Sequence, residues 1–233
     1  MRQMETVQQV DRFVHERRRT DRVLVGWGIY FFLLSWVTFG IYPSVVFYQR
    51  LARTDAFRER KIHYYDAVIT ATREYARRSG HEDEARAALD DLHRETRQRL
   101  AQEHHRLRPG LSLFLAWITL GIWGLVSARR LMRFWWDAQE IEQDFDERLS
   151  VIWMRLGIVD YPLHFEPVAE THRSFAAHFV LTLCTLGIFG IVWDYRLHVD
   201  PDRTYPEFHD TEDAVLSALR FAEPSRRREP VSA

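Results

Sequence analysis

Three long windows of the sequence contain no Asp, Glu, Lys or Arg, and they limit what the chain can fold into. They cover residues 23–49, 109–128 and 174–193, and are 27, 20 and 20 residues long. All 32 Lys and Arg and all 33 Asp and Glu therefore lie in the other stretches. Because a hydrocarbon core about 30 Å thick takes roughly 20 residues of α-helix, each window is long enough for a membrane segment.

The windows also lack the polar stripe that a helix at the surface of a soluble core shows. We therefore predict an all-α integral membrane protein with three membrane-embedded helical repeats, at residues 22–50, 109–130 and 174–196, joined to long amphipathic helical extensions. It would be a multi-pass protein of the cell membrane. Arginines that follow the windows are expected to contact lipid headgroups, because their long side chains reach the interface. They are Arg50, Arg129, Arg130 and Arg196.

Each window carries the same short motif, with threonine, an apolar residue, glycine, isoleucine, an aromatic residue and then glycine or proline. The key residues are Thr38, Gly40 and Pro43; Thr119, Gly121 and Gly124; and Thr185, Gly187 and Gly190. A threonine hydroxyl can bond the carbonyl one turn back, and paired glycines allow helices to approach closely. We interpret the motif as a site of helix packing or a kink. The apex of a re-entrant hairpin is the remaining alternative.

The choice between crossing and re-entrant segments depends on where the motif lies. In the second window, twelve residues precede Gly121 and seven follow it, so a hairpin would have unequal arms and would draw Arg129 and Arg130 toward hydrocarbon. A charge placed at depth is unfavourable by about 2.5–3.5 kcal/mol on insertion scales. We therefore predict three crossings, although the distribution of Lys and Arg around the windows hardly favours either orientation.

The motif resembles an uncharacterised family of bacterial integral membrane proteins whose repeated segments read T-[LC]-G-I-Y-G-x-x-W. The third copy, residues 184–193, is the most similar, while Pro43 replaces the second glycine in the first copy and the second copy lacks the final tryptophan. The resemblance covers only the three windows. It implies a location in the bacterial inner membrane and carries no activity with it.

The charged stretches are predicted to be mainly helical. We expect an amphipathic helix over residues 1–21, a helical hairpin over 51–108, and an amphipathic helix over 131–157 that continues the second membrane segment. A linker would cover residues 158–173. The last segment, 197–233, is expected to be a tail with one short helix at 212–222.

Few residues suggest chemistry. The sequence has no phosphate-binding, dinucleotide-binding, serine-hydrolase or zinc-peptidase motif, so we predict no enzyme, no catalytic or metal site and no cofactor. The nearly balanced charge argues against a nucleic-acid partner. His178 lies inside the third window, and an ionisable side chain in a membrane is a functional candidate, although it lies only five residues after Arg173.

These observations favour a structural, scaffolding or protein-interaction role in the membrane. The predicted partners are membrane lipid and either a second copy of the chain or another protein. The protein partner would bind through the apolar helical stripes of residues 55–107, which we interpret as coiled-coil seams. A channel or transporter component for a small neutral solute, or an auxiliary subunit of one, is the alternative function. Ion coupling is disfavoured because no carboxylate lies in the windows.

Overall fold

The computed structural model describes residues 2–39, 41–103 and 106–222, and these residues form helices and loops without a strand. The prediction of an all-α fold is therefore confirmed for them. The elements are α1 (Arg2–Thr20), the π-helix η1 (Ile29–Leu34), α2 (Ser35–Val37), α3 (Ile41–Ser79), α4 (Glu82–Glu103), α5 (Pro109–Ile118), α6 (Ile122–Arg155), the 3-10 helix η2 (Ala169–Thr171), α7 (Phe175–Cys184) and α8 (Ile188–Ala222).

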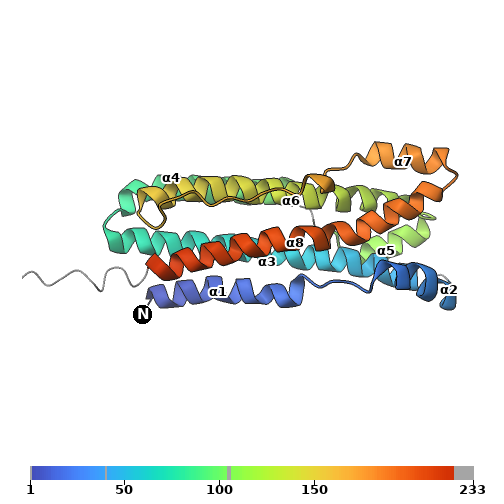
Figure 1. The fold of residues 1–233 in the computed structure, drawn as a ribbon, viewed down its shortest axis with the longest axis horizontal. Coiled ribbons are helices and arrows are strands. Elements are labelled where there is room, and N and C mark those ends of the chain that lie inside the picture. Colours follow the sequence, from blue (N-terminus) through green and yellow to red (C-terminus); the bar gives the residue numbers. More distant parts are fainter. Residues whose placement is uncertain (1, 40, 104–105, 223–233) are drawn as a thin grey trace, which may run out of the picture.

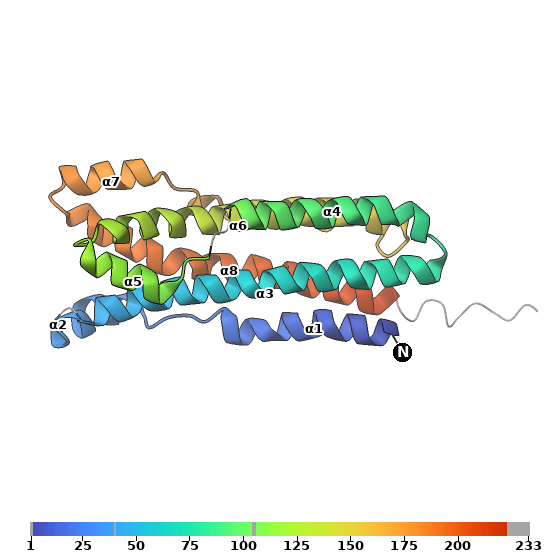
Figure 2. The same cartoon turned by 180° about the vertical axis from the view of Figure 1, so that it is seen from behind.

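The helices α1, α3, α4, α6 and α8 run along the long axis of an elongated bundle (Figure 1). Three short arms, formed by η1 with α2, by α5 and by α7, all lie at one end of that axis. Each arm is followed by a turn and then by the first part of a long helix that returns toward the opposite end, as the view from behind also shows (Figure 2). The N-terminus and the end of α8 lie at the opposite end.

No helix in the described parts of the chain is both long enough and apolar enough to span a membrane. The predictions of three crossings, of an integral membrane fold and of a multi-pass location in the cell membrane are therefore wrong. The physical reason is that each charge-free window is divided between a short arm and the start of a long helix that runs back. In the second window, the ten residues of α5 extend only about 15 Å at 1.5 Å per residue, and α6 then runs back.

The main hydrophobic core lies in the half of the bundle away from the short arms. It is formed by apolar faces of α1, α3, α4, α6 and α8, with Val10, Leu89 and Leu149 among its fully buried side chains. The apolar stripes of residues 55–107 are used here. Val68 and Leu92, for example, are buried in this core, so the stripes pack within the chain itself.

The C-terminal segment differs from the sequence prediction. We expected a tail after residue 196 with a short helix at 212–222, but α8 is one helix of 35 residues that ends at Ala222. Pro201 and Pro206 lie inside it, where a missing N–H normally ends a helix. Burial of the neighbouring Tyr205 and Phe208 in an aromatic cluster supports the helix across this region. Residues 223–233 lie outside the described residues.

Candidate functional site

The three motif threonines each join two helices by a pair of hydrogen bonds. Thr119 Oγ1 donates to the Leu115 carbonyl at 2.7 Å, near the end of α5, and accepts from the Trp123 amide at 2.9 Å, at the start of α6. Thr38 and Thr185 make the same two bonds at 2.6 and 3.0 Å and at 2.7 and 2.9 Å. One hydroxyl therefore satisfies a helix C-terminus and a helix N-terminus together, which holds the chain reversal.

The residues after each threonine turn the chain through left-handed backbone conformations. Phe39, Leu120 and Leu186 have φ of 48°, 48° and 49°, and Gly121 and Gly187 have φ of 91° and 94°. The Gly121 amide bonds the Ala116 carbonyl at 2.8 Å, which closes the end of α5. The motif thus reverses the chain instead of kinking one continuous helix. Gly40, the corresponding glycine of the first copy, lies outside the described residues.

The last position of the motif has a smaller part in the turn. Pro43 lies in the first turn of α3, where a proline is tolerated because that N–H has no partner within the helix. A Cβ built at Gly124 would meet nothing within 4 Å, so Gly124 is not a close-packing position. A Cβ at Gly190 would lie 3.3 Å from Thr182 Cγ2 on the opposite arm, so a packing role fits this copy alone.

We call residues 29–50, 109–130 and 175–196 hairpins 1, 2 and 3, and together they form the hairpin end. Their tips expose apolar side chains almost completely, since Phe39, Leu120 and Leu186 are 97%, 94% and 95% exposed. Among the described residues, the large apolar side chains that are exposed lie in the three charge-free windows or their flanks, except for Val151, Met154, Tyr161 and Phe221. Monomeric soluble proteins rarely expose a patch of this kind without a binding function.

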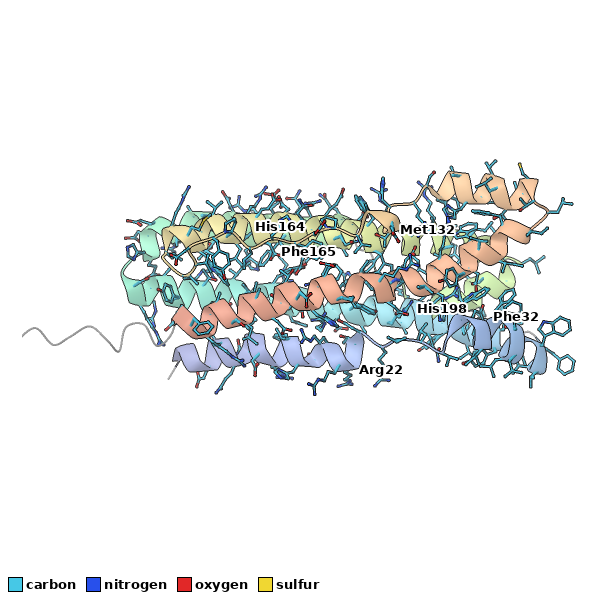
Figure 3. The ribbon with its side chains drawn as sticks, viewed as in Figure 1. Arg22, Phe32, Met132, His164, Phe165 and His198 are labelled. Carbon is cyan, nitrogen blue, oxygen red and sulfur yellow. The ribbon has the colours of Figure 1, made fainter. Side chains whose placement is uncertain are left out.

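Arginines surround the boundary between the hairpin end and the bundle. Arg22, Arg129 and Arg130 are exposed there, and Arg196 is half-buried, with its guanidinium 3.0 Å from His178 Nε2. Figure 3 shows Arg22 at this boundary and Phe32 farther out on the hairpin end. Arg50 differs from the sequence prediction of headgroup contact, because it is 5% exposed and points into the protein.

A polar cluster lies beneath the hairpins, and we call it the neck cluster. Arg50 donates to Asp194 Oδ1 at 2.6 Å, and the Trp27 indole donates to Asp194 Oδ2 at 2.9 Å. His198 contacts Arg50 through Nδ1 at 3.2 Å and the Val25 carbonyl through Nε2 at 2.8 Å. Burial, followed by the charge of Arg50, lowers the pKa of His198 to about 4, so the ring is neutral at pH 7. The cluster connects the approach to hairpin 1 with α3 and α8.

His178, the candidate inside the third window, is 6% exposed and packs against hairpin 3 itself. Its Nδ1 lies 2.9 Å from the Ser174 carbonyl, one turn earlier on the same helix. Its ring is 5.4 Å from that of Phe189. Together with the contact to Arg196, these interactions join the arm α7 to the first turns of α8.

A second polar cluster is buried between the helices of the bundle and was not found from the sequence. Lys61 donates to Glu142 Oε1 at 2.7 Å and to Glu212 Oε1 at 3.1 Å, and Arg60 also pairs with Glu212 at 2.8 Å. Tyr65 donates to the other oxygen of Glu142. The available signal was that Lys61 is the only lysine of the chain and lies within a helical apolar stripe.

Asp146 lies in the same cluster without a hydrogen-bond partner among the described residues. It is 1% exposed, and neither of its carboxyl oxygens is bonded. Burial, followed by the nearby Glu142 carboxylate, raises the pKa of Asp146 well above its usual range. A protonated acid is therefore the form that fits this site. In the described residues, no group of three or more His, Cys, Asp or Glu could hold a metal ion.

Comparison of the chain with protein-family models, with curated proteins and with solved structures finds no match. The resemblance of the repeated motif to a membrane protein family stays a prediction.

Proposed function

We propose that the hairpin end inserts into one leaflet of a lipid bilayer and that the helical bundle stands on the membrane surface as a structural and protein-interaction platform. The observation that carries this proposal is the gathering of three exposed apolar hairpins at one end of a polar bundle. The protein would enter the bilayer and turn back, so that no segment crosses. Interfacial insertion of an apolar surface is a recognised mode of membrane binding.

The lengths of the hairpins fit one leaflet. On the returning helices, the first arginine comes nine residues after Ile41 and seven residues after Ile122, which corresponds to roughly 10–14 Å of helix. Half of a hydrocarbon core is about 15 Å thick. The charge-free parts of hairpins 1 and 2 therefore reach about as deep as the middle of the bilayer, and charges begin again where the headgroups lie.

The distribution of charge supports lipid as the occupant of this surface. The tips have no charged side chain, whereas Arg22, Arg129 and Arg130 are exposed at the boundary. Arginines at that level can reach lipid phosphates, and basic residues near an anionic membrane surface favour binding by about 1 kcal/mol each.

The residues at the tips themselves are also informative. A left-handed conformation favours glycine or asparagine, yet the three described tip positions hold Phe39, Leu120 and Leu186. A side chain that is 94–97% exposed gains almost nothing from the fold to offset this strain. An exposed apolar residue in an unfavourable backbone conformation does not stabilise the fold, which indicates that it has a role in binding.

The bundle supplies the platform part of the proposal. Because the apolar stripes of residues 55–107 are buried inside the chain, a partner or a second copy would have to bind the polar outer faces. On α4, the exposed Arg94 and Asp91 lie on such a face and pair with each other at 3.0 Å. Partner binding through residues 55–107 stays a prediction, now for the polar outer faces of these helices.

Vesicle flotation tests the membrane part of the proposal. The test variant replaces Phe39, Leu120 and Leu186 by asparagine, which suits left-handed backbone and lacks apolar area. The control replaces Val151, Met154 and Tyr161 by asparagine, which removes exposed apolar side chains outside the hairpin end. We expect the unchanged protein and the control to float with anionic vesicles and the hairpin variant to stay in solution.

Two results would contradict the proposal. One is equal flotation of the hairpin variant and the control. The other is that the unchanged protein does not bind vesicles and instead forms a dimer that the three tip substitutions abolish. That result would show that the hairpin end binds a second copy of the chain.

A further inference from the structure

A cavity of about 580 Å³ lies beside α6, between that helix and the start of α7. One wall includes Arg129, Arg133 and Glu140 of α6, and the other includes His172 and Arg173. Figure 3 labels Met132, which also contributes to the cavity, near the place where the chain enters α7. The cavity therefore opens where hairpin 3 leaves the bundle.

The position of the cavity along α6 corresponds to the headgroup layer of the proposed membrane. Arg133 comes eleven residues after Ile122, about 16 Å from the tip at 1.5 Å per residue. Glu140 comes seven residues later, and helical side chains lean toward the N-terminus of their helix, so its carboxylate points back toward the tip. In a leaflet, headgroups occupy the region from about 15 to 22 Å from the bilayer centre.

The half of the cavity nearer the tips is basic. Arg173 is held in place by Asp200 through two bonds, at 3.0 and 3.2 Å, and Arg133 is paired with Asp137 at 3.2 Å. Arg129 is exposed, and no carboxylate in the described ranges forms an ion pair with it. Guanidinium groups of this kind bind phosphate oxygens with good geometry.

The half of the cavity farther from the tips is acidic. Glu140 accepts the Trp136 indole N–H at 2.9 Å through Oε1, so that Oε2 remains as an acceptor at the cavity. The Asp137 carboxylate lies in the same wall. The His172 ring is 4.2 Å from the Trp136 ring and covers that part of the indole. The cavity thus has cations toward the membrane centre and carboxylates toward water, close to balance in formal charge.

We infer that this cavity binds the headgroup of a glycerophospholipid that carries both a phosphodiester and a primary ammonium group, as in phosphatidylethanolamine. The inference rests on the proposed function, because a lipid reaches the cavity only when the hairpins are inserted. The phosphate lies against Arg129 and Arg173, and the ammonium group donates to Glu140. A primary ammonium fits better than a trimethylammonium group because Glu140 needs a hydrogen-bond donor, and the part of the Trp136 ring covered by His172 is closed to a quaternary cation.

Binding to two kinds of vesicle tests the inference. Both contain the same minority of phosphatidylglycerol, and the remainder is phosphatidylcholine in one and phosphatidylethanolamine in the other, so that surface charge is equal. We expect roughly tenfold tighter binding to the ethanolamine vesicles, which is the size of one charge-assisted hydrogen bond. Mono- and dimethylated ethanolamine lipids should give intermediate binding, because each methyl group removes a donor.

Matched variants separate the cavity from the general effect of lipid shape. Glu140→Gln should lose the ethanolamine preference, whereas Glu147→Gln, the same change at an exposed position farther along α6, should keep it. Arg129→Gln should weaken binding to both vesicles and reduce the preference. Arg130→Gln, the same charge change outside the cavity lining, should weaken binding without altering the preference.

The outcomes distinguish this inference from the proposed function. Equal binding to both vesicles, or a preference that Glu140→Gln retains, would overturn the headgroup site and leave membrane insertion standing. No binding to either vesicle would overturn both. Binding of soluble glycerophosphoethanolamine in the absence of vesicles, as tight as binding to the ethanolamine vesicles, would assign the cavity to a soluble phosphate ester instead of a lipid.

Discussion

Arg50 of α3 and Asp194 of α8 form an ion pair of 2.6 Å, although they are 144 positions apart in the sequence. Each follows a chain reversal, so the pair fixes hairpin 1 relative to hairpin 3. Burial alone would raise the pKa of Asp194, but the Arg50 charge and the hydrogen bonds from Arg50 and Trp27 together outweigh burial, so the pKa is lowered. The pair thus stabilises the charged carboxylate and holds the apolar tips at one end.

The substitution Asp194→Asn should destabilise the fold strongly. It leaves the Arg50 guanidinium, whose side chain is 6% exposed, without its anionic partner. Removing one partner of a buried pair lowers the free energy of unfolding by about 3–5 kcal/mol, and the double variant Arg50→Met with Asp194→Leu should lose much less. Urea denaturation measures both values. An equal decrease in the free energy of unfolding in the single and double variants would show that the ion pair does not stabilise the fold in this way.

Substitution of the tip residue Leu120 should raise the stability of the fold and weaken membrane binding. Leu120→Asn places a residue that tolerates φ of 48° at a site where leucine is strained and fully exposed. We expect the free energy of unfolding in solution to rise by about 1 kcal/mol, while vesicle affinity falls. Thermal unfolding and flotation of the same preparation test this. A variant that is less stable in solution would show that Leu120 supports the fold.

Substitutions at Gly121 and Gly124 can show whether the motif acts as a turn or as a helix-packing face. Gly121 has φ of 91°, so Gly121→Ala should lower the free energy of unfolding by about 1–2 kcal/mol. Gly124 is helical and a Cβ there meets nothing within 4 Å, so Gly124→Ala should raise it by roughly 0.5–1 kcal/mol. Chemical denaturation of both variants gives the comparison. A loss at Gly124 as large as that at Gly121 would favour helix packing over chain reversal.

The buried Asp146 should make stability depend on pH. Its pKa is raised in the folded protein by burial and by Glu142, so the folded state binds a proton that the unfolded state releases above its ordinary pKa. Stability from this group is therefore present at acidic pH and is lost as pH rises above about 4. Lys61, Tyr64 and Tyr65 from α3 and Glu212 from α8 are the other titratable groups close to it.

Asp146→Asn, which mimics the protonated acid, tests this dependence. The unfolding free energy of the variant relative to the unchanged protein should increase with pH, by at most about 1.4 kcal/mol per pH unit for a single proton. Urea denaturation between pH 5 and pH 8 would measure it, with Asp144→Asn as the control, because Asp144 is partly exposed and paired with Arg148. A difference that is constant across this range would contradict the protonated state of Asp146.

Some of the fold could be predicted from the sequence because it depends on local patterns. Charge-free windows, helical stripes and the repeated motif all indicate an all-α chain with three equivalent segments. The length of a window cannot distinguish one crossing helix from two antiparallel arms, because both need the same apolar residues. Arg129 and Arg130 do not exclude a hairpin, because both are exposed and can extend toward the interface.

The polar sites depend on contacts between distant segments. Arg50 follows an apolar window as Arg129 does, and only the approach of α8 shows that one is buried and the other exposed. The cluster of Lys61, Glu142 and Glu212 joins three helices in the same way. No spacing in one sequence reveals such contacts. The reversal itself could have been found, since a capping threonine followed two residues later by glycine is a helix stop and start.

Depth measurement on the tips tests whether the hairpin end inserts into one leaflet. With Cys184 replaced by serine, single cysteines at positions 39, 120 and 186 would carry a spin label, and a label at position 161 would serve as the control. In anionic vesicles, we predict that all three tip labels lie within the hydrocarbon of one leaflet, near its midplane side, and that the label at 161 stays in water. Tip labels that remain exposed to water, or that react with a reagent confined to the opposite side, would contradict insertion into one leaflet.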